Sequence, residues 1–250
     1  MIQNLTLIKI GGSLLETGNF ERFVKALAPQ LRKQKAVIVH GGGKEVTRLA
    51  KRLKIQSQFV RGRRFTNDKM MSLVERVLSG KVNPHLVKRL NALGVPAVGL
   101  SGRDGGIVRA KKVAGLGRVG LPVKVKTEPI RKILLSGNIP VFSSIASDHR
   151  GRALNVNADE MACALAMALK ARRLILFTDV PGILNASQKT IHRIHEKSAA
   201  ELIRKGVITG GMIPKVLSAI SALKKGVREI LIFEGKLPLA KAKGTSLVRV

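Results

Sequence analysis

The sequence contains no tryptophan and no tyrosine, and it has only seven phenylalanines among 250 residues. Its hydrophobic content of 45% is nevertheless ordinary for a globular protein with a large core. The core must therefore be built from leucine, isoleucine, valine and alanine. Proteins that bind single-stranded nucleic acid commonly stack bases on aromatic side chains, so the composition argues against that class.

Cysteine is almost absent as well. Cys163 is the one cysteine, which excludes an internal disulfide and a cysteine-rich zinc site. It lies in the apolar helical run "ADEMACALAMAL", a context typical of a buried, inert thiol. The five histidines show no metal-ligand spacing, and His192 and His195 stand in a basic stretch without a carboxylate pattern. We therefore predict no metal site built from protein side chains.

Acidic residues are scarce. Only 15 Asp and Glu oppose 46 Lys and Arg, which gives a formal net charge of +31. Such a field attracts polyanions at low salt whatever the function of the protein. The cations are spread along the whole chain, however, and no nucleic-acid-binding motif accompanies them. A solvated basic surface is the favoured interpretation, and no specific nucleic-acid partner is expected.

Long apolar runs are also missing. No stretch approaches the roughly 18 residues of a membrane span. The beginning of the sequence, "MIQNLTLIKIGG", fits a first β-strand and not a signal peptide. We expect a cytoplasmic protein without membrane contact.

The sequence does contain a regular alternation of strand-like and helix-like stretches. Strands are expected at 5–10, 36–40, 97–100, 139–146, 173–179 and 227–235, with a hairpin strand at 107–113. The stretch 70–94 has the pattern of two helices broken near Gly80 or Pro84. The alternation predicts an α/β fold with a mostly parallel sheet covered by helices on both faces. A boundary near 146–153 would divide it into lobes at 1–150 and 151–250.

Two glycine loops fall at strand ends, "KIGGS" at 9–13 and "HGGGKE" at 40–45. Ligands bind parallel sheets at the carboxyl ends of the strands, and backbone N–H groups between a strand and a helix can close on an anion. Neither loop has the spacing of a P-loop or of the Gly-x-Gly-x-x-Gly dinucleotide motif. Taken alone, each loop is equally compatible with an ordinary tight turn.

Two lysines stand where a cation is unfavourable, and one aspartate stands out beside an apolar helix. Lys9 interrupts an apolar strand, where it needs a partner or an anion unless the strand lies at a sheet edge. Lys215 follows Pro214 in the first turn of a helix, an unfavourable place for a cation unless it meets an anionic ligand or faces water. Asp159 precedes an alanine-rich helix and either caps that helix or pairs with buried lysines.

Further polar residues surround these three in the sequence. Asn155 and Asn157 precede Asp159 at alternate positions, which places the three side chains on one side of an extended segment. The arginine cluster of "RGRRFTND" supplies guanidinium groups whose fork suits a carboxylate. An acidic ligand is the chemistry that this cluster fits.

Taken together and in this order, the segments described above and their neighbours resemble the amino acid kinase superfamily, and within it the N-acetylglutamate kinases most closely. The matching segments run from residue 7 to residue 216: "IKIGGSLL", "VIVHGGGKEV", "GRRFT", "VGLSGRDGG", "LNVNADEMACALA", "LILFTDVPGIL" and "TGGMIPKV". Each glycine loop alone is unspecific, whereas the whole set is specific. The resemblance implies a three-layer αβα sandwich with an open, mainly parallel, eight-stranded sheet. It also implies a substrate-binding and dimerising lobe at 1–150 and an ATP-binding lobe at 151–250.

The reaction implied by the resemblance converts ATP and N-acetyl-L-glutamate into ADP and N-acetyl-L-glutamyl 5-phosphate, a step of arginine biosynthesis. The acceptor is a γ-carboxylate, which is already a nucleophile and requires no general base. Catalysis then reduces to positioning and charge stabilisation. ATP and Mg²⁺ are the implied cofactors, with Mg²⁺ arriving bound to ATP.

The resemblance also implies roles for individual residues. Lys9 and Lys215 would bracket the transferring phosphoryl group, and Asp159 would hold both ammonium groups. The substrate-binding residues would be Gly42, Gly43, Arg64 and Asn155, with Arg64 on the α-carboxylate. Gly11 and Gly12 would donate N–H groups to the phosphates. The rest of the ATP site would comprise Asp179, Val180, Pro181, Gly182, Ile183, Leu184, Val207, Ile208 and Thr209.

Two departures from the family pattern leave other functions open. Asn67 follows "RFT" where the family often has an acidic or small residue, and the +31 charge is not a family feature. The charge would suit a related kinase for α-aminoadipate or glutamate held on an acidic carrier protein. Those relatives tend toward "NIDGD" and "GMNRK", however, whereas this chain has "NVNAD" and "GGMIPK".

A catalytically inactive relative that binds polyanions is the remaining alternative. Such a protein would be expected to lose chemical residues, yet Lys9, Asp159 and Lys215 are all present. Regulation is partly predictable too. Arginine-sensitive relatives carry an extra N-terminal helix, and here the first strand begins almost at Met1, so we expect an arginine-insensitive homodimer.

Overall fold

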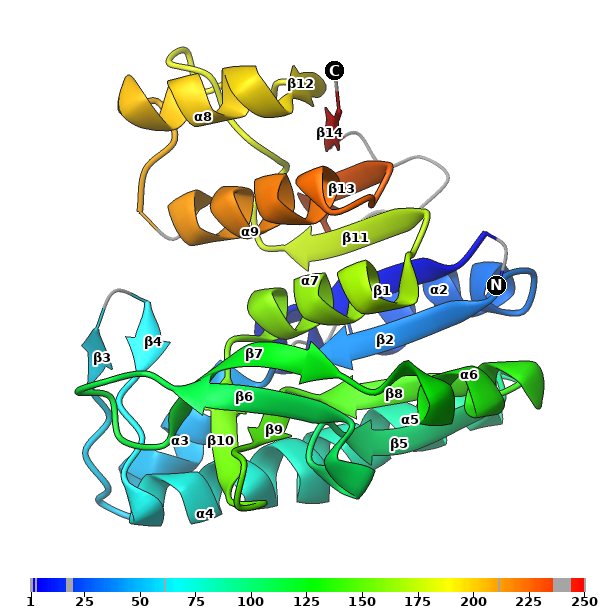
Figure 1. Ribbon diagram of the computed structural model, residues 1–250, viewed down its shortest axis with the longest axis vertical. Coiled ribbons are helices and arrows are strands. Elements are labelled where there is room, and N and C mark those ends of the chain that lie inside the picture. Colours follow the sequence, from blue (N-terminus) through cyan, green and yellow to red (C-terminus); the bar gives the residue numbers. More distant parts are fainter. Residues whose placement is uncertain are drawn as a thin grey trace.

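A mainly parallel sheet of eight strands forms the centre of the molecule, in the order β12-β14-β13-β11-β1-β2-β8-β5 (Figure 1). The computed structural model describes residues 2, 4–16, 20–60, 62–210, 212–235 and 244–249. Neighbouring strands run parallel except β13 and β14, which are antiparallel, so the expected sheet is confirmed. Its strands are β1 (Thr6–Ile10), β2 (Ala36–His40), β5 (Ala97–Ser101), β8 (Ile139–Ser143), β11 (Arg173–Thr178), β12 (Arg193–His195), β13 (Glu229–Glu234) and β14 (Thr245–Val248).

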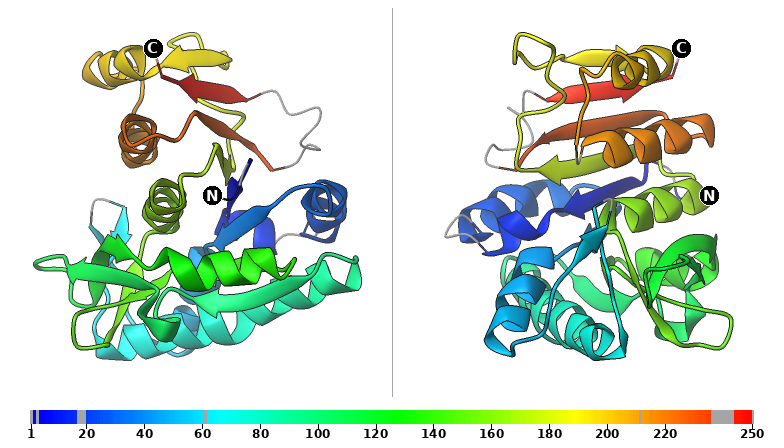
Figure 2. Two further views of the ribbon diagram at one scale, coloured as in Figure 1. Left: turned by 45° about the vertical axis from the view of Figure 1, so that its right-hand side comes forward. Right: turned by 90° about the vertical axis from the view of Figure 1, so that its left-hand side faces the viewer.

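Different helices cover the two faces of the sheet, because side chains alternate along each strand. Leu7 of β1 packs in one core cluster with α7 and α9, whereas Ile8 and Ile10 pack in another with α2 and α5. The two views of Figure 2 show these helices on opposite faces, which confirms the three-layer αβα arrangement. The covering helices are α2 (Phe20–Leu31) and α5 (Asn83–Ala92) on one face, and α6 (Thr127–Leu135), α7 (Ala158–Leu169), α8 (Glu196–Arg204) and α9 (Met212–Lys224) on the other.

A small closed barrel, which the sequence did not predict, lies beside the sheet. Its strands β6 (Val108–Lys112), β7 (Val119–Val125), β9 (Ile145–Ser147) and β10 (Ala153–Val156) follow the order β10-β7-β6-β9, and the short helix η2 (Asp104–Gly106) precedes them. The expected hairpin at 107–113 is the antiparallel pair β6–β7. β9 and β10 are also paired antiparallel, so the boundary between 150 and 151 falls in the turn of a hairpin. The division into a substrate lobe and a nucleotide lobe stays a prediction.

The two helices expected within 70–94 are confirmed as α4 and α5, but the break between them near Gly80 is a π-helical turn and not a loop. α4 (Asp68–Val77) continues through the π-helical turn η1 (Leu78–Val82) into α5 without leaving the helical path. Pro84 lies in the first turn of α5 and has no N–H to donate to the preceding turn. The wider π turn before it accommodates the missing donor, so the chain stays helical past Gly80 and Pro84.

The remaining elements lie where the glycine loops end. They are α1 (Gly12–Glu16) after β1, α3 (Gly43–Arg52) after β2, and the hairpin of β3 (Phe59–Val60) and β4 (Arg63–Arg64). Asn67 follows this hairpin and caps α4, because its Oδ1 accepts a hydrogen bond from Met70 N at 2.8 Å. The departure from the family pattern at Asn67 therefore has a structural explanation.

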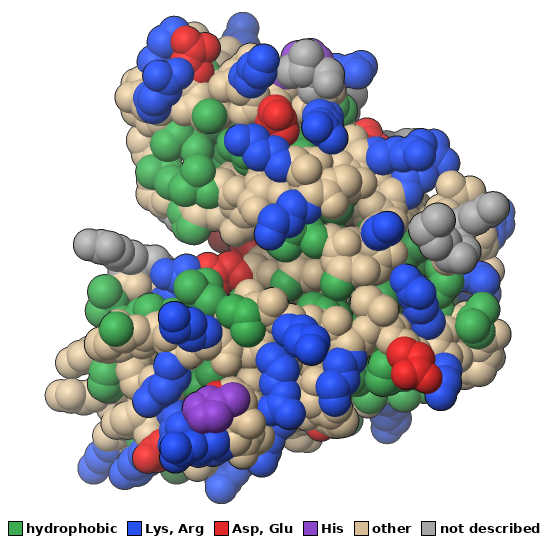
Figure 3. Space-filling view, in the orientation of Figure 1, with side chains coloured by type: hydrophobic (Ala, Val, Ile, Leu, Met, Phe, Trp, Pro, Cys, Tyr) green, Lys and Arg blue, Asp and Glu red, His purple; other side chains and the backbone are tan. Residues whose placement is uncertain are grey.

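Aliphatic side chains dominate the core, as the composition predicts, but three phenylalanines meet within it. Phe177 contacts Phe23 and Phe233 edge to face, with ring centroids 4.9 and 4.8 Å away. These rings come from α2, β11 and β13 and join one helical layer to the sheet. On the outside, Lys and Arg side chains are distributed over the whole face shown in Figure 3.

Candidate active site

Lys9, Asp159 and Lys215 meet near the carboxyl end of β1. Lys9 Nζ lies 3.0 Å from Asp159 Oδ1, and Lys215 Nζ donates a hydrogen bond to Asp159 Oδ2 at 2.7 Å. β1 is a central strand and both lysines are only 8% exposed, which excludes an edge position for Lys9 and a surface position for Lys215. One carboxylate between two ammonium groups leaves a net positive charge, which suits an anionic group placed beside the lysines.

Asn157 caps α7 and thereby leaves the Asp159 carboxylate to the lysines. Asn157 Oδ1 accepts hydrogen bonds from Asp159 N at 2.8 Å and from Glu160 N at 3.4 Å. The alternative that Asp159 is the cap is therefore wrong. Asp159 stands in the first turn of α7, where the helix dipole also favours a negative charge.

The charges of this cluster fix the protonation state of Asp159. Burial would raise the pKa of Asp159, but the ammonium groups of Lys9 and Lys215 outweigh it and lower that pKa to about 2. Burial also lowers the pKa of Lys215, and the nearby Lys9 lowers it further. Asp159 is thus a permanent counter-charge at neutral pH and is unsuited to general base catalysis.

Replacing Asn157 with alanine should lower the free energy of unfolding by about 1 kcal/mol, because N–H groups at the start of α7 lose their acceptor. Asn157→Ser keeps a side-chain oxygen at the cap and should stay within about 0.5 kcal/mol of the unchanged protein. Urea unfolding followed by circular dichroism measures both. Equal losses in the two variants would contradict the capping role.

The two glycine loops lie directly against each other. A Cβ atom on Gly12 would come within 3.0 Å of the Gly42 nitrogen and 3.1 Å of the Gly43 nitrogen. A Cβ atom on Gly42 would come within 2.6 Å of Leu78 Cδ2 in η1. Missing side chains thus let the first loop approach the start of α3. The first N–H groups of that helix have no partner within it and favour a negatively charged ligand.

Two cavities meet at Lys9 and Gly12, which line both of them. The first cavity, of about 210 Å³, lies between the glycine loops, the β3–β4 hairpin and the start of α7. The second, of about 500 Å³, lies between the first glycine loop, the end of β11 and the start of α9. Figure 3 shows a hollow in the surface between the upper and lower parts of the molecule. A group bound in one cavity can therefore react across Lys9 with a group bound in the other.

Arg64 is a second buried cation of the first cavity, in addition to Lys9. It is 7% exposed, and its Nη2 donates to Gly43 O at 2.8 Å and to Thr47 Oγ1 at 2.7 Å. Its guanidinium also lies over the ring of Phe59, 4.5 Å from the centroid. Burial lowers the pKa of Arg64, which nevertheless remains charged at neutral pH. The contacts hold the guanidinium in one orientation before any ligand arrives.

The other expected substrate residues line the same cavity, namely Gly42, Gly43 and Asn155. Asn155 lies on β10, and its Nδ2 donates to Thr66 Oγ1 at 3.1 Å. Asn155, Asn157 and Asp159 do not share one extended segment, because the chain becomes helical after Asn157, yet all three line this cavity. The structure therefore brings the expected substrate residues together.

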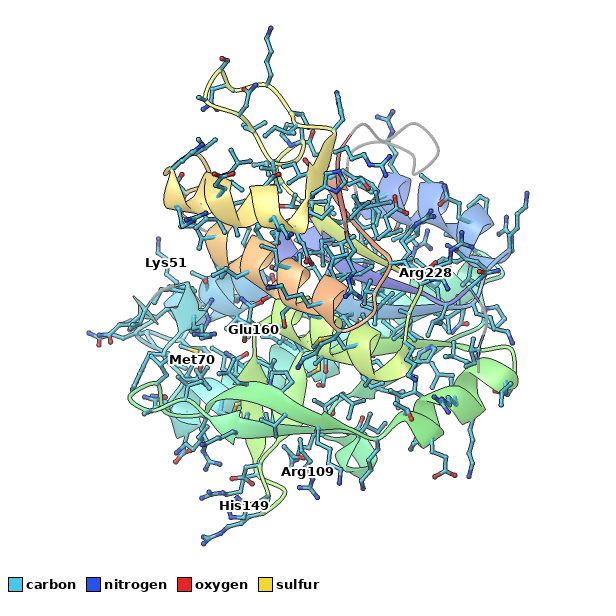
Figure 4. All side chains as sticks on the ribbon, turned by 45° about the horizontal axis from the view of Figure 1, so that its top comes forward. Lys51, Met70, Arg109, His149, Glu160 and Arg228 are labelled. Atoms are coloured by element: carbon cyan, nitrogen blue, oxygen red, sulfur yellow. The ribbon has the colours of Figure 1, made fainter. Side chains whose placement is uncertain are left out.

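Sequence reasoning missed an ion pair at this cavity. Arg63 of β4 lines the cavity and bonds to Glu160, the residue after Asp159. Burial raises the pKa of Glu160, and Arg63 opposes that rise. Figure 4 labels Glu160, which lies at the start of α7 in the middle of the molecule. The available signal was a second carboxylate in an apolar helix, which needs a partner. Arg61, from the same arginine cluster, lies outside the described residues.

The second cavity contains part of the expected ATP site. Its lining includes Gly11, Gly12, Asp179, Val180 and Thr209, together with Thr178 and Met212, which were not expected. The other expected residues lie elsewhere: Ile183 and Ile208 in the core, Gly182 against Thr245, and Pro181, Leu184 and Val207 outside the lining. Their assignment to the nucleotide stays a prediction.

Three further features of the described residues concern a thiol, metal ligands and membrane spans. Cys163 on α7 is 3% exposed, and burial raises the pKa of its thiol, as expected for an inert cysteine. Among the described residues, no group of three or more His, Cys, Asp or Glu is arranged to hold a metal ion. Within that same part of the chain, no helix is both long and apolar enough to cross a membrane.

Known proteins are similar to this chain in sequence and in fold. Residues 4–234 match the amino acid kinase family. The acetylglutamate kinase of Endomicrobium trichonymphae is 42% identical over 245 residues, 98% of each chain. That of Geobacillus stearothermophilus is 43% identical over 232 residues, 92% of this chain and 90% of the other. The crystal structure of smu.665 from Streptococcus mutans UA159 matches with a TM-score of 0.86 at 31% identity and covers 98% of both chains.

Proposed function

Because the chain belongs to the amino acid kinase family, and within it to the acetylglutamate kinases, we propose that it phosphorylates the γ-carboxylate of N-acetyl-L-glutamate with ATP. The products would be ADP and N-acetyl-L-glutamyl 5-phosphate, an acyl phosphate of arginine biosynthesis. The observation that carries the proposal is the Lys9–Asp159–Lys215 cluster at the junction of two cavities. One cavity suits an acidic substrate, and the other suits a nucleotide.

The reaction needs positioning and positive charge more than proton transfer. An oxygen of the acceptor carboxylate attacks the γ-phosphorus of ATP while the bond to the bridging β-phosphate oxygen breaks. Lys9 borders both cavities and stabilises the charge on the transferring phosphoryl group. Lys215 borders the nucleotide cavity and stabilises the charge that develops on ADP. Asp159 holds the two ammonium groups at a fixed spacing.

The substrate would lie in the first cavity. Arg64 offers a preoriented guanidinium for the α-carboxylate, and Asn155 on β10 offers an amide in the same cavity. The N–H groups of Gly42 and Gly43 would donate from the start of α3 to the substrate and to the group that is transferred to it. On the nucleotide side, Gly11 and Gly12 would donate to the phosphates, with Asp179, Val180 and Thr209 beside the nucleotide.

Mg²⁺ would enter with the nucleotide. The described residues offer no cluster of metal ligands at the site, and the carboxylate of Asp159 is already bound by two lysines. Mg²⁺ retains several waters and binds chiefly to phosphates in sites of this kind. When bound, it would neutralise charge on the β- and γ-phosphates, and the protein residues would supply the remaining positive charge.

A coupled assay of ADP release with alternative acceptors tests the proposed function. We expect N-acetyl-L-glutamate to be preferred over N-acetyl-L-aminoadipate by roughly 10-fold to 100-fold in kcat/KM, because an extra methylene displaces the reacting carboxylate. Free L-glutamate lacks the acyl group and should be poorer still. If none of these acceptors is turned over but glutamate or aminoadipate on an acidic carrier protein is, the carrier-dependent kinase is the better assignment.

Arg64→Lys should raise the KM for N-acetyl-L-glutamate by roughly 10-fold to 100-fold while changing kcat and the KM for ATP by less than about 3-fold. Lysine keeps the charge but loses the planar fork that binds a carboxylate through two N–H groups. Steady-state kinetics with each substrate varied measure the effect. Arg173→Lys is the matched control, because Arg173 pairs with Glu229 away from the cavities and is half exposed. An unchanged KM in Arg64→Lys would contradict the clamp.

The lobes, the assembly and the location of the enzyme stay predictions. We expect residues 1–150 to bind the substrate and to form a homodimer, and residues 151–250 to bind ATP. We further expect a cytoplasmic enzyme that is insensitive to arginine. Light scattering that detects a hexamer, or inhibition by millimolar arginine, would contradict this part of the proposal.

A further inference from the structure

His40, the last residue of β2, is fully buried directly before the glycine triplet. Its Nε2 lies 3.0 Å from Asn83 Nδ2, and its Nδ1 lies 2.8 Å from Gly41 O. Asn83 Nδ2 also donates to Val141 O at 2.8 Å, which fixes the orientation of this amide. Since Nδ2 can only donate, Nε2 of His40 must accept. Nδ1 therefore carries the proton of the ring and donates it to Gly41 O.

The surroundings allow this ring only one state. Burial lowers the pKa of His40 to about 4, so the ring is neutral at physiological pH. A second proton would set the Nε2–H of the ring against the N–H of Asn83. The mechanism above uses no proton donor or acceptor at this place. A ring held in one tautomer and one orientation is instead suited to hold a neighbouring backbone group.

The group that His40 holds is the peptide between Gly41 and Gly42. In a trans peptide the carbonyl of Gly41 and the N–H of Gly42 lie in one plane and point in opposite directions. The hydrogen bond from His40 to Gly41 O therefore directs the N–H of Gly42 to the other side. Gly12 lies against that group, because a Cβ atom on Gly12 would be 3.0 Å from the Gly42 nitrogen. Gly42 lines the first cavity and Gly12 lines both, so the Gly42 amide lies in the first cavity beside a residue that borders the second.

The π turn η1 brings the partners of this peptide into place. Asn83 directly follows η1, and Leu78 at its beginning packs against Gly42. Gly99 on β5 leaves room for the Asn83 amide, since a Cβ atom there would lie 2.2 Å from Asn83 Oδ1. The irregular turn therefore directs an amide at His40 and an aliphatic side chain at the glycine loop.

We propose that His40 and Asn83 are positioning residues that fix the Gly41–Gly42 peptide, so that the N–H of Gly42 donates to the oxygen that gains charge during phosphoryl transfer. The proposal rests on the proposed function, because the two cavities must hold acceptor and ATP. A donor oriented in advance needs no rearrangement as the charge develops. His40 thus acts through the backbone and touches neither substrate.

Kinetics of two variants and one control test the proposal. His40→Phe keeps a ring but loses both nitrogens, and it should lower kcat roughly 100-fold, the typical effect of losing one preorganised donor. Asn83→Leu keeps the volume and frees the ring to turn, and it should lower kcat roughly 10-fold. The KM for ATP should change by less than about 3-fold in both. Asn91→Ala is the matched control, because Asn91 ties the same helix α5 to Ala97 on β5 and should leave kcat within about 2-fold.

Nuclear magnetic resonance decides the hydrogen-bond arrangement independently of activity. With ¹⁵N-labelled histidine, the unchanged enzyme should show one neutral ring protonated at Nδ1 at pH 7. With ¹⁵N-labelled glycine, Asn83→Leu should shift the Gly42 amide resonance, and Asn91→Ala should not. Protonation of the His40 ring at Nε2 would overturn the proposal. An unmoved Gly42 resonance in Asn83→Leu, or full kcat in both variants, would overturn it as well.

Different results would contradict the proposed function and the positioning role of His40 and Asn83. If the unchanged enzyme does not phosphorylate N-acetyl-L-glutamate, the proposed function fails, while the resonance measurements still decide whether His40 holds the peptide. If it is active and Asn83→Leu retains full kcat and an unmoved Gly42 resonance, only the positioning role fails. Should His40→Phe not fold, Asn83→Leu and the labelled unchanged enzyme remain sufficient.

Discussion

Lys9→Met is expected to lower kcat roughly 1000-fold while the protein keeps its fold, since losing one preorganised donor lowers kcat by about 10²-fold to 10³-fold. Methionine preserves the apolar stem within the buried strand and removes only the ammonium group that borders both cavities. Asp159 would keep its hydrogen bond from Lys215, so the substitution leaves no buried carboxylate without a partner. An ADP-release assay and thermal unfolding measure the two expectations.

Lys132→Met is the matched control for this variant. Lys132 is an exposed lysine on α6 that pairs with Glu128, and its loss should leave kcat within about 2-fold. A Lys9→Met enzyme that retains more than a tenth of kcat would contradict a role in phosphoryl transfer. A protein that unfolds on Lys9→Met would show instead that the lysine chiefly supports the structure.

The sheet was predictable because buried parallel strands read as continuous apolar runs between helical stretches. β1, β2 and β11 are of this kind, and their side chains are buried on both faces except for Arg173 at the start of β11. The barrel was not predictable, because its strands lack such continuous apolar runs. β6 contains three basic residues, and β9 and β10 have three and four residues, too short for a periodic pattern. Their pairing depends on contacts across the fold.

The helical path from α4 to α5 shows how tertiary packing overrides local signals. Gly80 and Pro84 both favour a helix end. Leu78, Val82 and Leu86 nevertheless are buried in the core, and the π turn keeps the chain helical across both signals. The contact between this turn and the glycine loop forms only in the folded chain, because Leu78 and Gly42 lie far apart in the sequence.

The catalytic cluster was partly predictable from charge placed against pattern. A lysine within an apolar strand and another at a helix start are unusual enough to be noticed in a single sequence. Asn157 and Asp159 are both good capping residues, however, and their separate roles appear only in the structure. The ion pair of Arg63 and Glu160 joins residues 97 positions apart, a pairing that no local pattern encodes.

Asp159→Asn is expected to lower the free energy of unfolding at pH 7 by roughly 3 kcal/mol and kcat by at least about 100-fold. The substitution leaves the ammonium groups of Lys9 and Lys215 close together without a counter-charge. They would repel each other or lose a proton, and in either case the phosphoryl group would no longer meet two fixed cations. Urea unfolding and the ADP-release assay measure the two effects. Asp148→Asn is the matched control, because Asp148 is a buried carboxylate bound by Arg152 away from the cavities, so its loss should reduce stability without a comparable loss of kcat.

The pH dependence of the free energy of unfolding distinguishes the effect of the Asp159 charge from the effect of its shape. Its pKa in the folded protein is about 2, below the ordinary value of 3.8, so its charge stabilises the fold fully above pH 4 and progressively less as the pH falls toward 2. A shift of this size corresponds to about 2 kcal/mol of stability at neutral pH. The difference in unfolding free energy between the unchanged protein and Asp159→Asn should therefore shrink as the pH is lowered from 5 to 2, because a protonated Asp159 resembles asparagine. A difference that stays constant over this range would show that the two lysines do not depend on the negative charge of Asp159.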